Sequence, residues 1–160
     1  MKIAVVSDTH RQYGKIEKVC SVIVRENPDR ILHLGDLAED ADVMEALLDR
    51  SVLRVAGNCD GGSGEPLELL LQLEGQTIFA THGHLYRVKL TTEGLLQAAR
   101  DKGASIALYG HTHLAREESR LGVTLVNPGS AALPHGGQAP TMAFLELAPQ
   151  GVKVRFVPIG

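Results

Sequence analysis

The chain has 160 residues, of which 44% are hydrophobic and 22% charged, with a formal net charge of −3 at pH 7. This balance predicts one domain spanning residues 1–160, with a core large enough to fold without cross-links, and it argues against binding to long nucleic acid or to an anionic membrane surface. The N-terminal apolar run is too short for a signal peptide, and no apolar segment has the length of a membrane span, so we expect a cytoplasmic protein.

Strand and helix signals alternate over the first two-thirds of the chain. Short β-branched runs predict strands, and the apolar spacing between them predicts helices. In the second helix Val43, Ala46 and Leu47 share one face, and Asp42 is placed to cap its start. Such alternation predicts parallel strands joined by crossover connections. The predicted strands are residues 3–7, 31–34 and 51–55. The first helix covers residues 16–24, with Ile16, Val19, Cys20, Ile23 and Val24 on its apolar face.

The rest of the chain favours strands. Pairs of strand-like runs are separated by short turns such as Glu74-Gly75, which predicts antiparallel hairpins. No internal repeat or interdomain linker is present. The predicted pairs are 67–73 with 77–81, 116–120 with 123–126 and 142–147 with 152–157, and between them lie a helix over 95–102 and a strand over 106–109.

Polar residues follow five of the predicted strands at the point where each strand ends. The carboxyl ends of parallel strands meet at one edge of a sheet, where ligands normally bind. Carboxylates and imidazoles together suit borderline divalent metals, and the glycines fit a backbone that must come close to an ion. Each motif alone has a structural explanation, such as a turn, but five at successive strand ends predict a metal site. They are Asp8-Thr9-His10, Gly35-Asp36, Gly57-Asn58-Cys59-Asp60, Thr81-His82-Gly83-His84 and Gly110-His111-Thr112-His113.

In this order the motifs resemble those of the calcineurin-like metallophosphoesterases. The short chain, Cys59, and Asn127-Pro128-Gly129-Ser130 after the last motif resemble the small prokaryotic phosphodiesterase branch of that family. The resemblance covers essentially the whole chain. It implies an α/β fold, a four-layer αββα sandwich of two facing mixed β-sheets flanked by helices. It also implies a hydrolase, most specifically a phosphodiesterase, in which a water or hydroxide bridging two metal ions attacks a phosphate ester.

The resemblance further implies two divalent ions, with manganese as the first expectation and iron, nickel, zinc or cobalt as alternatives. Two ions about 3.5–4 Å apart can share a carboxylate and polarise a phosphoryl group. Asp36 is the implied shared ligand, and Asn58 adds an oxygen without further negative charge, so both are also counted as catalytic residues. One ion would be held by Asp8, His10, Asp36 and His113, and the other by Asp36, Asn58, His82 and His111.

The chain departs from the family pattern at Cys59, where most members have a histidine that is proposed to protonate the leaving group. A thiol with its ordinary pKa of about 8.5 is poorly suited to that role at pH 7. His84 is the candidate donor instead, and esters with good leaving groups are the expected substrates. Asp60 is expected to orient a metal ligand through a hydrogen bond. Cys20 falls on a helix face far from Cys59, so no disulfide is expected.

Several charged or aromatic residues near the motifs have two possible roles. Arg11 is placed either to clamp a phosphate or to form a surface salt bridge. Arg87 and Lys89 are either solvated loop charges or part of the entrance to the site. His33 is expected to be hydrogen-bonded in the core, and His135 to be a loop residue or a substrate contact.

Two other classes of function are weighed against the enzyme. A retromer subunit of this fold works as a protein-interaction scaffold with altered ligand positions, whereas all seven implied ligands are intact here. Retaining them favours an enzyme, because buried polar groups are costly without a metal. Nucleases of this fold carry added DNA-binding segments, for which this chain lacks both length and positive charge. We therefore expect a small phosphate-ester substrate, and small relatives of the family point to a homodimer.

Overall fold

The computed structural model describes all 160 residues and contains ten β-strands and three α-helices. Each predicted strand and helix is confirmed, with ends shifted by a few residues; the third strand is only two residues long. None of the helices combines the length and apolar character needed to cross a membrane. In chain order the elements are β1 (Lys2–Val6), α1 (Tyr13–Glu26), β2 (Arg30–His33), α2 (Asp40–Leu48), β3 (Leu53–Arg54), β4 (Glu68–Leu73), β5 (Gln76–Thr81), the 3₁₀ helix η1 (His84–Tyr86), α3 (Glu93–Asp101), β6 (Ile106–Leu108), β7 (Ala115–Arg120), β8 (Val123–Pro128), β9 (Thr141–Ala148) and β10 (Gly151–Pro158).

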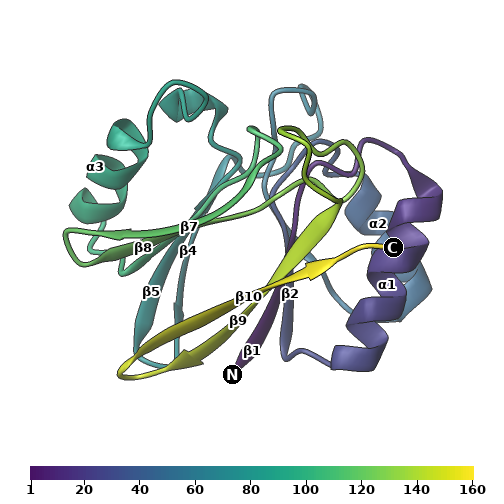
Figure 1. The fold of residues 1–160 in the computed structure, drawn as a ribbon, viewed down its shortest axis with the longest axis horizontal. Coiled ribbons are helices and arrows are strands. Elements are labelled where there is room, and N and C mark those ends of the chain that lie inside the picture. Colours follow the sequence, from purple (N-terminus) through teal and green to yellow (C-terminus); the bar gives the residue numbers. More distant parts are fainter.

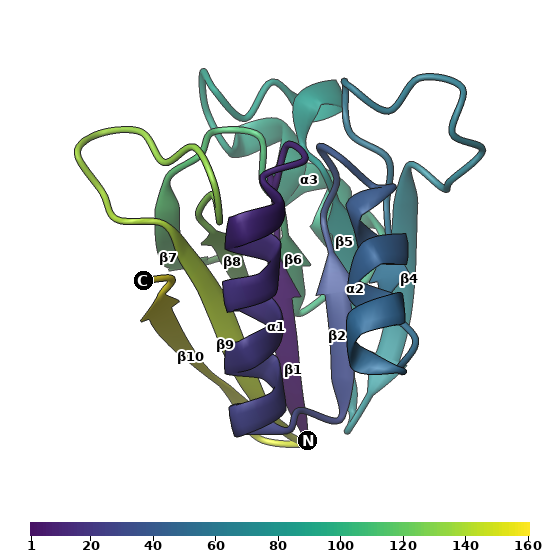
Figure 2. The same ribbon diagram turned by 90° about the vertical axis from the view of Figure 1, so that its right-hand side faces the viewer.

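The strands form two five-stranded mixed sheets that face each other (Figure 1). The first sheet has the order β10-β9-β1-β2-β3, in which β1, β2 and β3 are parallel, β9 is antiparallel to β1, and β10 is antiparallel to β9. The second has the order β4-β5-β6-β8-β7, with parallel β5, β6 and β8 between antiparallel edge strands. Helices α1 and α2 cover the outer face of the first sheet (Figure 2), and α3 covers that of the second. The predicted four-layer αββα sandwich is confirmed.

Three apolar clusters hold these layers together. One cluster lies between the sheets, where Val5 and Leu32 of the first sheet meet Ile106 and Leu108 of the second. A second cluster joins α1 and α2 to the outer face of the first sheet, and a third joins α3 to the second sheet. Burial of this apolar surface is the main stabilising contribution, and it fixes the strand ends relative to one another.

Helix α2 buries a different face from the one predicted. Ala41 and Met44 are fully buried, Val43 is half-buried, and Ala46 and Leu47 are exposed. The prediction grouped Val43, Ala46 and Leu47 by helical spacing, but the stripe that begins at Ala41 has the same spacing and faces the sheet. In so short a helix both stripes are plausible from periodicity alone.

The start of α2 also differs from the prediction. The helix begins at Asp40, and Asp42 forms an ion pair with Arg54 instead of capping the helix. Three backbone N–H groups of the first turn, those of residues 40, 41 and 42, donate to the carbonyls of the preceding turn, residues 37–39. Because this turn satisfies the free N–H groups, the helix has no side-chain cap.

Helix α1 has the predicted apolar face with one exception. Val24 is 69% exposed, whereas Val22, which was not predicted to face the core, is buried. Val22 lies three residues after Val19 and so falls on the buried stripe, while Val24 is rotated toward solvent. Cys20 is buried in α1 and Cys59 is exposed in a loop, and both are free thiols as predicted.

Candidate metal centre

The five polar motifs lie in loops at one end of the sandwich, and both sheets contribute to them. The first sheet positions Asp8 after β1, Asp36 after β2 and Asn58 after β3, and the second positions His82 after β5 and His111 after β6. The prediction placed these strand ends along one edge of a single sheet. They lie instead where the ends of two sheets face each other, so ligands from distant parts of the sequence come together.

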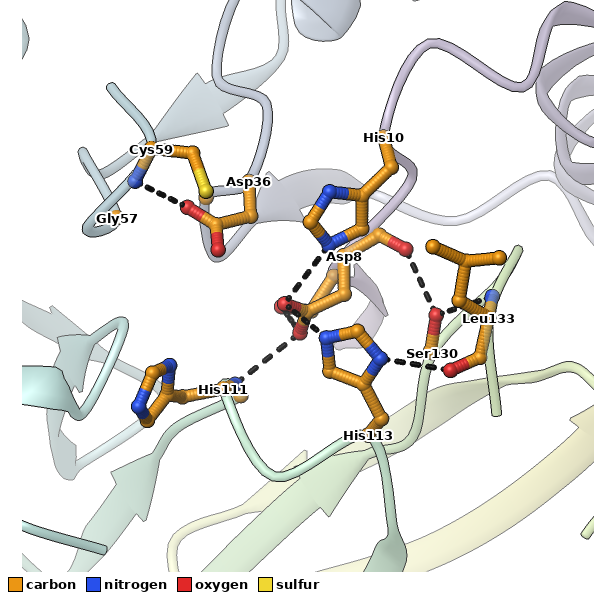
Figure 3. A network of polar contacts seen from close by, with 12 residues as sticks. Asp8, His10, Asp36, Gly57, Cys59, His111, His113, Ser130 and Leu133 are labelled. Carbon is orange, nitrogen blue, oxygen red and sulfur yellow. Dashed lines mark hydrogen bonds and ion pairs between the residues drawn. The ribbon is translucent and has the colours of Figure 1, made fainter. Parts of the chain in front are cut away.

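The first ligand cluster consists of Asp8, His10 and His113, whose ligand atoms lie within 4.8 Å of one another. Asp8 Oδ2 accepts hydrogen bonds from the Ser7 hydroxyl at 2.6 Å and from the His111 N–H at 3.1 Å. Asp8 Oδ1 is buried and has no hydrogen bond, yet it lies 3.1 Å from His113 Nε2 and 3.7 Å from His10 Nε2 (Figure 3). A buried carboxylate oxygen left without a donor is placed to bind a cation.

The second cluster consists of Asp36, His82 and His111, again within 4.8 Å of one another. His82 Nε2 lies 3.3 Å from Asp36 Oδ2 and 3.1 Å from Asn58 Oδ1. It also lies 3.9 Å from Asp8 Oδ1, so the two clusters are adjacent. The structure thus brings all seven residues predicted as ligands into one region.

Two histidines have a ring nitrogen fixed by a backbone carbonyl. His82 Nδ1 lies 2.7 Å from the Leu34 oxygen, and His113 Nδ1 lies 2.6 Å from the Leu133 oxygen. A carbonyl can only accept, so Nδ1 carries the proton and Nε2 of the neutral ring presents a lone pair. Each lone pair faces a carboxylate oxygen, which is repulsive unless a cation or a proton lies between them. The residues therefore fit divalent metal ions, with the tautomers that metal ligation requires.

The charges of the site shift pKa values in opposite directions. Burial alone raises the pKa of Asp8, but contacts with His10 and His113 outweigh it and lower this pKa overall. Contact with Asp8 raises the pKa of His113. Burial and repulsion from His82 lower the pKa of His111 to about 4, so its ring is neutral at pH 7. A neutral imidazole is the form that binds a metal.

The local backbone is adapted to these side chains. The φ angles of Asp8, Asp36 and His113 are +56°, +50° and +60°, a left-handed conformation that costs energy for residues other than glycine. The two glycines that precede Asn58 and His111 have a role in addition to the predicted close approach of the backbone to an ion. A Cβ atom at Gly57 would collide with Asp36 Oδ1, and one at Gly110 would lie 2.8 Å from Asp8 Oδ2. These glycines make room for the carboxylates.

Asp60 connects the second and third motifs. Its Oδ2 accepts the N–H of Asp36 at 3.0 Å and that of Gly57 at 2.8 Å, and its Oδ1 accepts the N–H of Ala38 at 3.0 Å. The residue is buried and makes no contact with the imidazoles. It therefore positions the loops that carry Asp36 and Asn58, in line with the orienting role expected of it.

A buried network behind the first motif was only partly anticipated. The Gly35 N–H donates to His33 Nδ1 at 3.0 Å, so His33 Nε2 carries the proton and donates to Thr9 Oγ1 at 2.9 Å. Thr9 donates in turn to Asp40, whose carboxylate also accepts the Arg11 N–H at 2.9 Å. His33 was expected to be hydrogen-bonded in the core, but the positioning roles of Thr9 and Asp40 were missed, because loop contacts leave no periodic signal in the sequence.

Two residues of the Asn-Pro-Gly-Ser segment also support the site. Asn127 Nδ2 donates to the Gly110 carbonyl at 3.1 Å and to Thr112 Oγ1 at 2.9 Å. The Ser130 hydroxyl donates to the Asp8 carbonyl at 2.7 Å (Figure 3). The sequence reasoning used this segment only as part of the family resemblance. The burial of both polar side chains is the feature that marks their role.

The residues predicted at the edge of the site differ in their surroundings. Arg11 forms an ion pair with exposed Glu39 at 2.5 Å, which is the surface salt bridge given above as one of its two possible roles. His84 begins η1, and its ring centroid lies 5.5 Å from that of His82; burial and His82 lower its pKa. Cys59 is exposed, and partial burial of its thiol together with the nearby Asp36 carboxylate raises its pKa.

A sequence profile of the calcineurin-like phosphoesterase superfamily domain matches residues 1–150. The probable metallophosphoesterase YsnB of Bacillus subtilis (strain 168) is 32% identical over 158 residues, covering 98% of this chain and 90% of YsnB. The phosphodiesterase YfcE of Escherichia coli (strain K12) is 29% identical over 169 residues, covering 91% and 88%. The crystal structure of Chaetomium thermophilum Vps29 has the same fold, with a TM-score of 0.80 at 17% identity over 98% of this chain and 96% of Vps29. The chain therefore belongs to the calcineurin-like phosphoesterase superfamily, alongside small prokaryotic metallophosphoesterases.

Proposed function

We propose that this protein is a phosphodiesterase that depends on two divalent metal ions. The observation that carries the proposal is the Asp8 carboxylate, whose buried Oδ1 has no hydrogen bond and lies between the Nε2 atoms of His10 and His113. A cation accounts for this arrangement better than any group of the chain does. The similarity to YfcE, which is named a phosphodiesterase, supports diesters as the substrate class.

In this proposal Asp36 is the ligand common to both ions. Bound divalent ions supply Lewis-acid stabilisation of the charge on the phosphoryl group and lower the pKa of a bound water. The hydrogen bonds of His82 and His113 to backbone carbonyls keep their Nε2 atoms directed into the site. Manganese is our first candidate, and iron, nickel, zinc and cobalt are the alternatives. The first ion is assigned to the cluster of Asp8, His10 and His113, and the second to that of Asp36, His82 and His111. The family resemblance adds Asp36 to the ligands of the first ion and Asn58 to those of the second.

The two candidate donors for the leaving group are both uncharged near neutral pH. The raised pKa of Cys59 keeps it a thiol, and the lowered pKa of His84 keeps its ring neutral. Neither is tuned to protonate a poor leaving group at pH 7. We therefore propose that the preferred substrates release an alcohol of low pKa, and that Arg11, which is engaged with Glu39, contributes little.

A metal-by-substrate screen tests the proposed function. Protein freed of metal with a chelator is supplied with each of the five candidate ions and assayed with an aryl phosphodiester and with the aryl monoester of the same phenol. We expect no activity without metal and faster hydrolysis of the diester with it. Folded protein that binds metal but hydrolyses neither ester would contradict the proposal.

That last outcome would favour a protein-interaction scaffold as the second candidate function. The similarity in fold to Vps29 is the observation that supports this second candidate. The seven assembled ligand side chains speak for the enzyme, because desolvating them without a metal is costly.

A further inference from the structure

A groove with a volume of about 410 Å³ opens beside the first ligand cluster. His135, on its rim, connects the groove to the metal centre, because its ring stacks on that of His113 with centroids 4.5 Å apart and planes 25° apart. Thr112, between the ligands His111 and His113, forms part of the wall. A molecule bound at the metal centre can therefore extend directly into this groove.

The groove contains a hydrogen-bonding group that the protein leaves free. Tyr109 is 2% exposed and lines the groove, and its hydroxyl has no hydrogen-bond partner in the chain. A phenolic hydroxyl keeps its proton at pH 7 and can donate it in a hydrogen bond. Because this hydroxyl is not among the buried polar atoms that lack a partner, it opens onto the groove, where a ligand can accept its hydrogen bond.

The charge of the groove is positive. Lys89 is exposed on its rim and has no acidic partner. Arg116, on the opposite wall, is paired with Glu118 at 3.3 Å, and Glu118 also accepts a hydrogen bond from Thr92. The pair is neutral as a whole, so the free charge of Lys89 sets the sign. Leu90 and Leu114 complete the walls with apolar surface.

A second hollow, on the other side of the metal centre, has the opposite character. It has a volume of about 350 Å³ and is lined by the glycine-rich loop of residues 61–64 and by Asn58 and His84. Its charged members are Asp60 and Glu65, and no lysine or arginine lines it. The two hollows are thus suited to different groups, an anionic one near Lys89 and an uncharged one near the glycines.

We propose that the groove beside His113 binds one arm of a phosphodiester substrate, and that this arm carries an aromatic ring and a second anionic group. The proposal rests on the proposed function, which places the reacting phosphate at the metal ions. The ring packs between His135 and the leucines, and the anion meets Lys89 and the Tyr109 hydroxyl. Diesters that have only uncharged arms are then poorer substrates.

Two synthetic diesters test this specificity. Both release p-nitrophenol; the retained arm is phenyl in one and carboxyphenyl in the other. We expect wild type to favour the carboxyphenyl ester by about five- to tenfold in kcat/KM, through a lower KM, as one charge-assisted hydrogen bond provides. Lys89→Ala should reduce this ratio to near one, and Tyr109→Phe should reduce it partly. Lys153→Ala, which removes an exposed lysine of β10 at the far end of the sheets, should keep it. Equal kcat/KM values in wild type, or an unchanged ratio in Lys89→Ala, would overturn the proposal.

Failure of the proposed function gives a different result. If no metal supports hydrolysis of either ester, the intact esters are titrated into the metal-loaded protein by calorimetry. Tighter binding of the carboxyphenyl ester that is lost in Lys89→Ala then supports the anion site although the enzyme proposal has failed. Equal affinities for the two esters overturn the groove proposal.

Discussion

The two ligand clusters differ in how far solvent reaches them. In the first cluster the Asp8 side chain is 0% exposed and that of His113 is 12% exposed. In the second, Asp36 and His82 are both buried, whereas Asp8 is the one buried ligand of the first, where His10 is 22% exposed. The exposed side of the second cluster is at Asn58 and Cys59, in the loop after β3.

This difference separates firm metal binding from access to the substrate. Asp8 is fixed by Ser7, by the His111 N–H and by Ser130, so its free oxygen is held in place before any ion binds. The second cluster depends on Asn58, an exposed residue in a loop that is held by Asp60 and by the hydrogen bond from the Cys59 N–H to Asp36. We infer that the first ion binds more tightly and that the second exchanges more readily, because preorganised ligands lose less entropy on binding.

The largest expected effect comes from Asp36, the ligand that we propose is common to both ions. Asp36→Asn should lower kcat/KM by about 10³-fold or more, roughly 4 kcal/mol in activation free energy, because both ions lose a charged ligand. Asn58→Ala should cost less, since it affects only the second ion. Steady-state assays at saturating manganese compare the two, with thermal unfolding to confirm that each variant is folded. An equal or smaller loss at Asp36 would remove its bridging role.

Cys59 and His84, beside the second cluster, should control how strongly the rate of hydrolysis depends on the pKa of the released alcohol. Wild type should cleave aryl esters far faster than alkyl esters, and Cys59→His should accelerate alkyl esters by up to about 10²-fold, because a positioned acid contributes 10²–10⁴-fold. If His84 is the donor, His84→Ala should slow alkyl esters much more than aryl ones. Rates are measured for a series of esters graded by the pKa of the alcohol. A wild-type rate that does not depend on this pKa, with chemistry rate-limiting, would refute the account.

Asp60 should affect the second cluster more than the first. Both carboxylate oxygens of Asp60 accept hydrogen bonds from backbone N–H groups. In Asp60→Asn one of these oxygens is replaced by an NH₂ group, which cannot accept. Whichever way the amide is turned, at least one backbone N–H therefore loses its acceptor. We expect a 10–100-fold loss of affinity for the weaker ion, as is typical for residues behind a metal ligand. Asp49→Asn, at the exposed end of α2, is the matched control and should bind metal as wild type does. Equal losses at both ion sites would show that Asp60 supports the whole fold instead.

The smallest effect concerns the network behind the first cluster. Burial lowers the pKa of His33 from 6.5 to about 4. The unfolded chain therefore takes up this proton first, and the stability that His33 contributes above pH 6.5 is lost as the pH falls toward about 4. Between pH 7 and 5.5 the loss is about 1 kcal/mol. Denaturant unfolding of metal-free protein measures the free energy of unfolding at each pH, and this free energy should vary less with pH in His33→Gln than in wild type. The same variation in both proteins would mean that His33 does not contribute to it.

The residues that the sequence predicts as ligands lie in one region because each stands within a few residues of a strand end. Residue type and position at a strand end were enough for Asp8, Asp36 and His82, and the arrangement of the sheets then brings them together. The face of α2 could not be predicted, since the stripes of Val43 and of Met44 are equally regular in so short a helix. Periodicity ranks apolar faces only in longer elements.

The supporting contacts were beyond what the sequence reveals. Thr9 reaches Asp40 across 31 residues, and Ser130 reaches Asp8 across 122. Such bonds depend on how loops from the two sheets pack, which no local pattern encodes. The homodimer, the native metal and the cytoplasmic location stay predictions.

The number of ions bound per chain is the most direct test of the two-cluster account. Calorimetric titration of manganese into metal-free protein at pH 7 measures this number and the affinity of each site together. We predict two ions per chain with unequal affinities, and loss of the weaker one in Asn58→Ala. Saturation at one ion, or the absence of saturable binding in folded protein, would contradict the account.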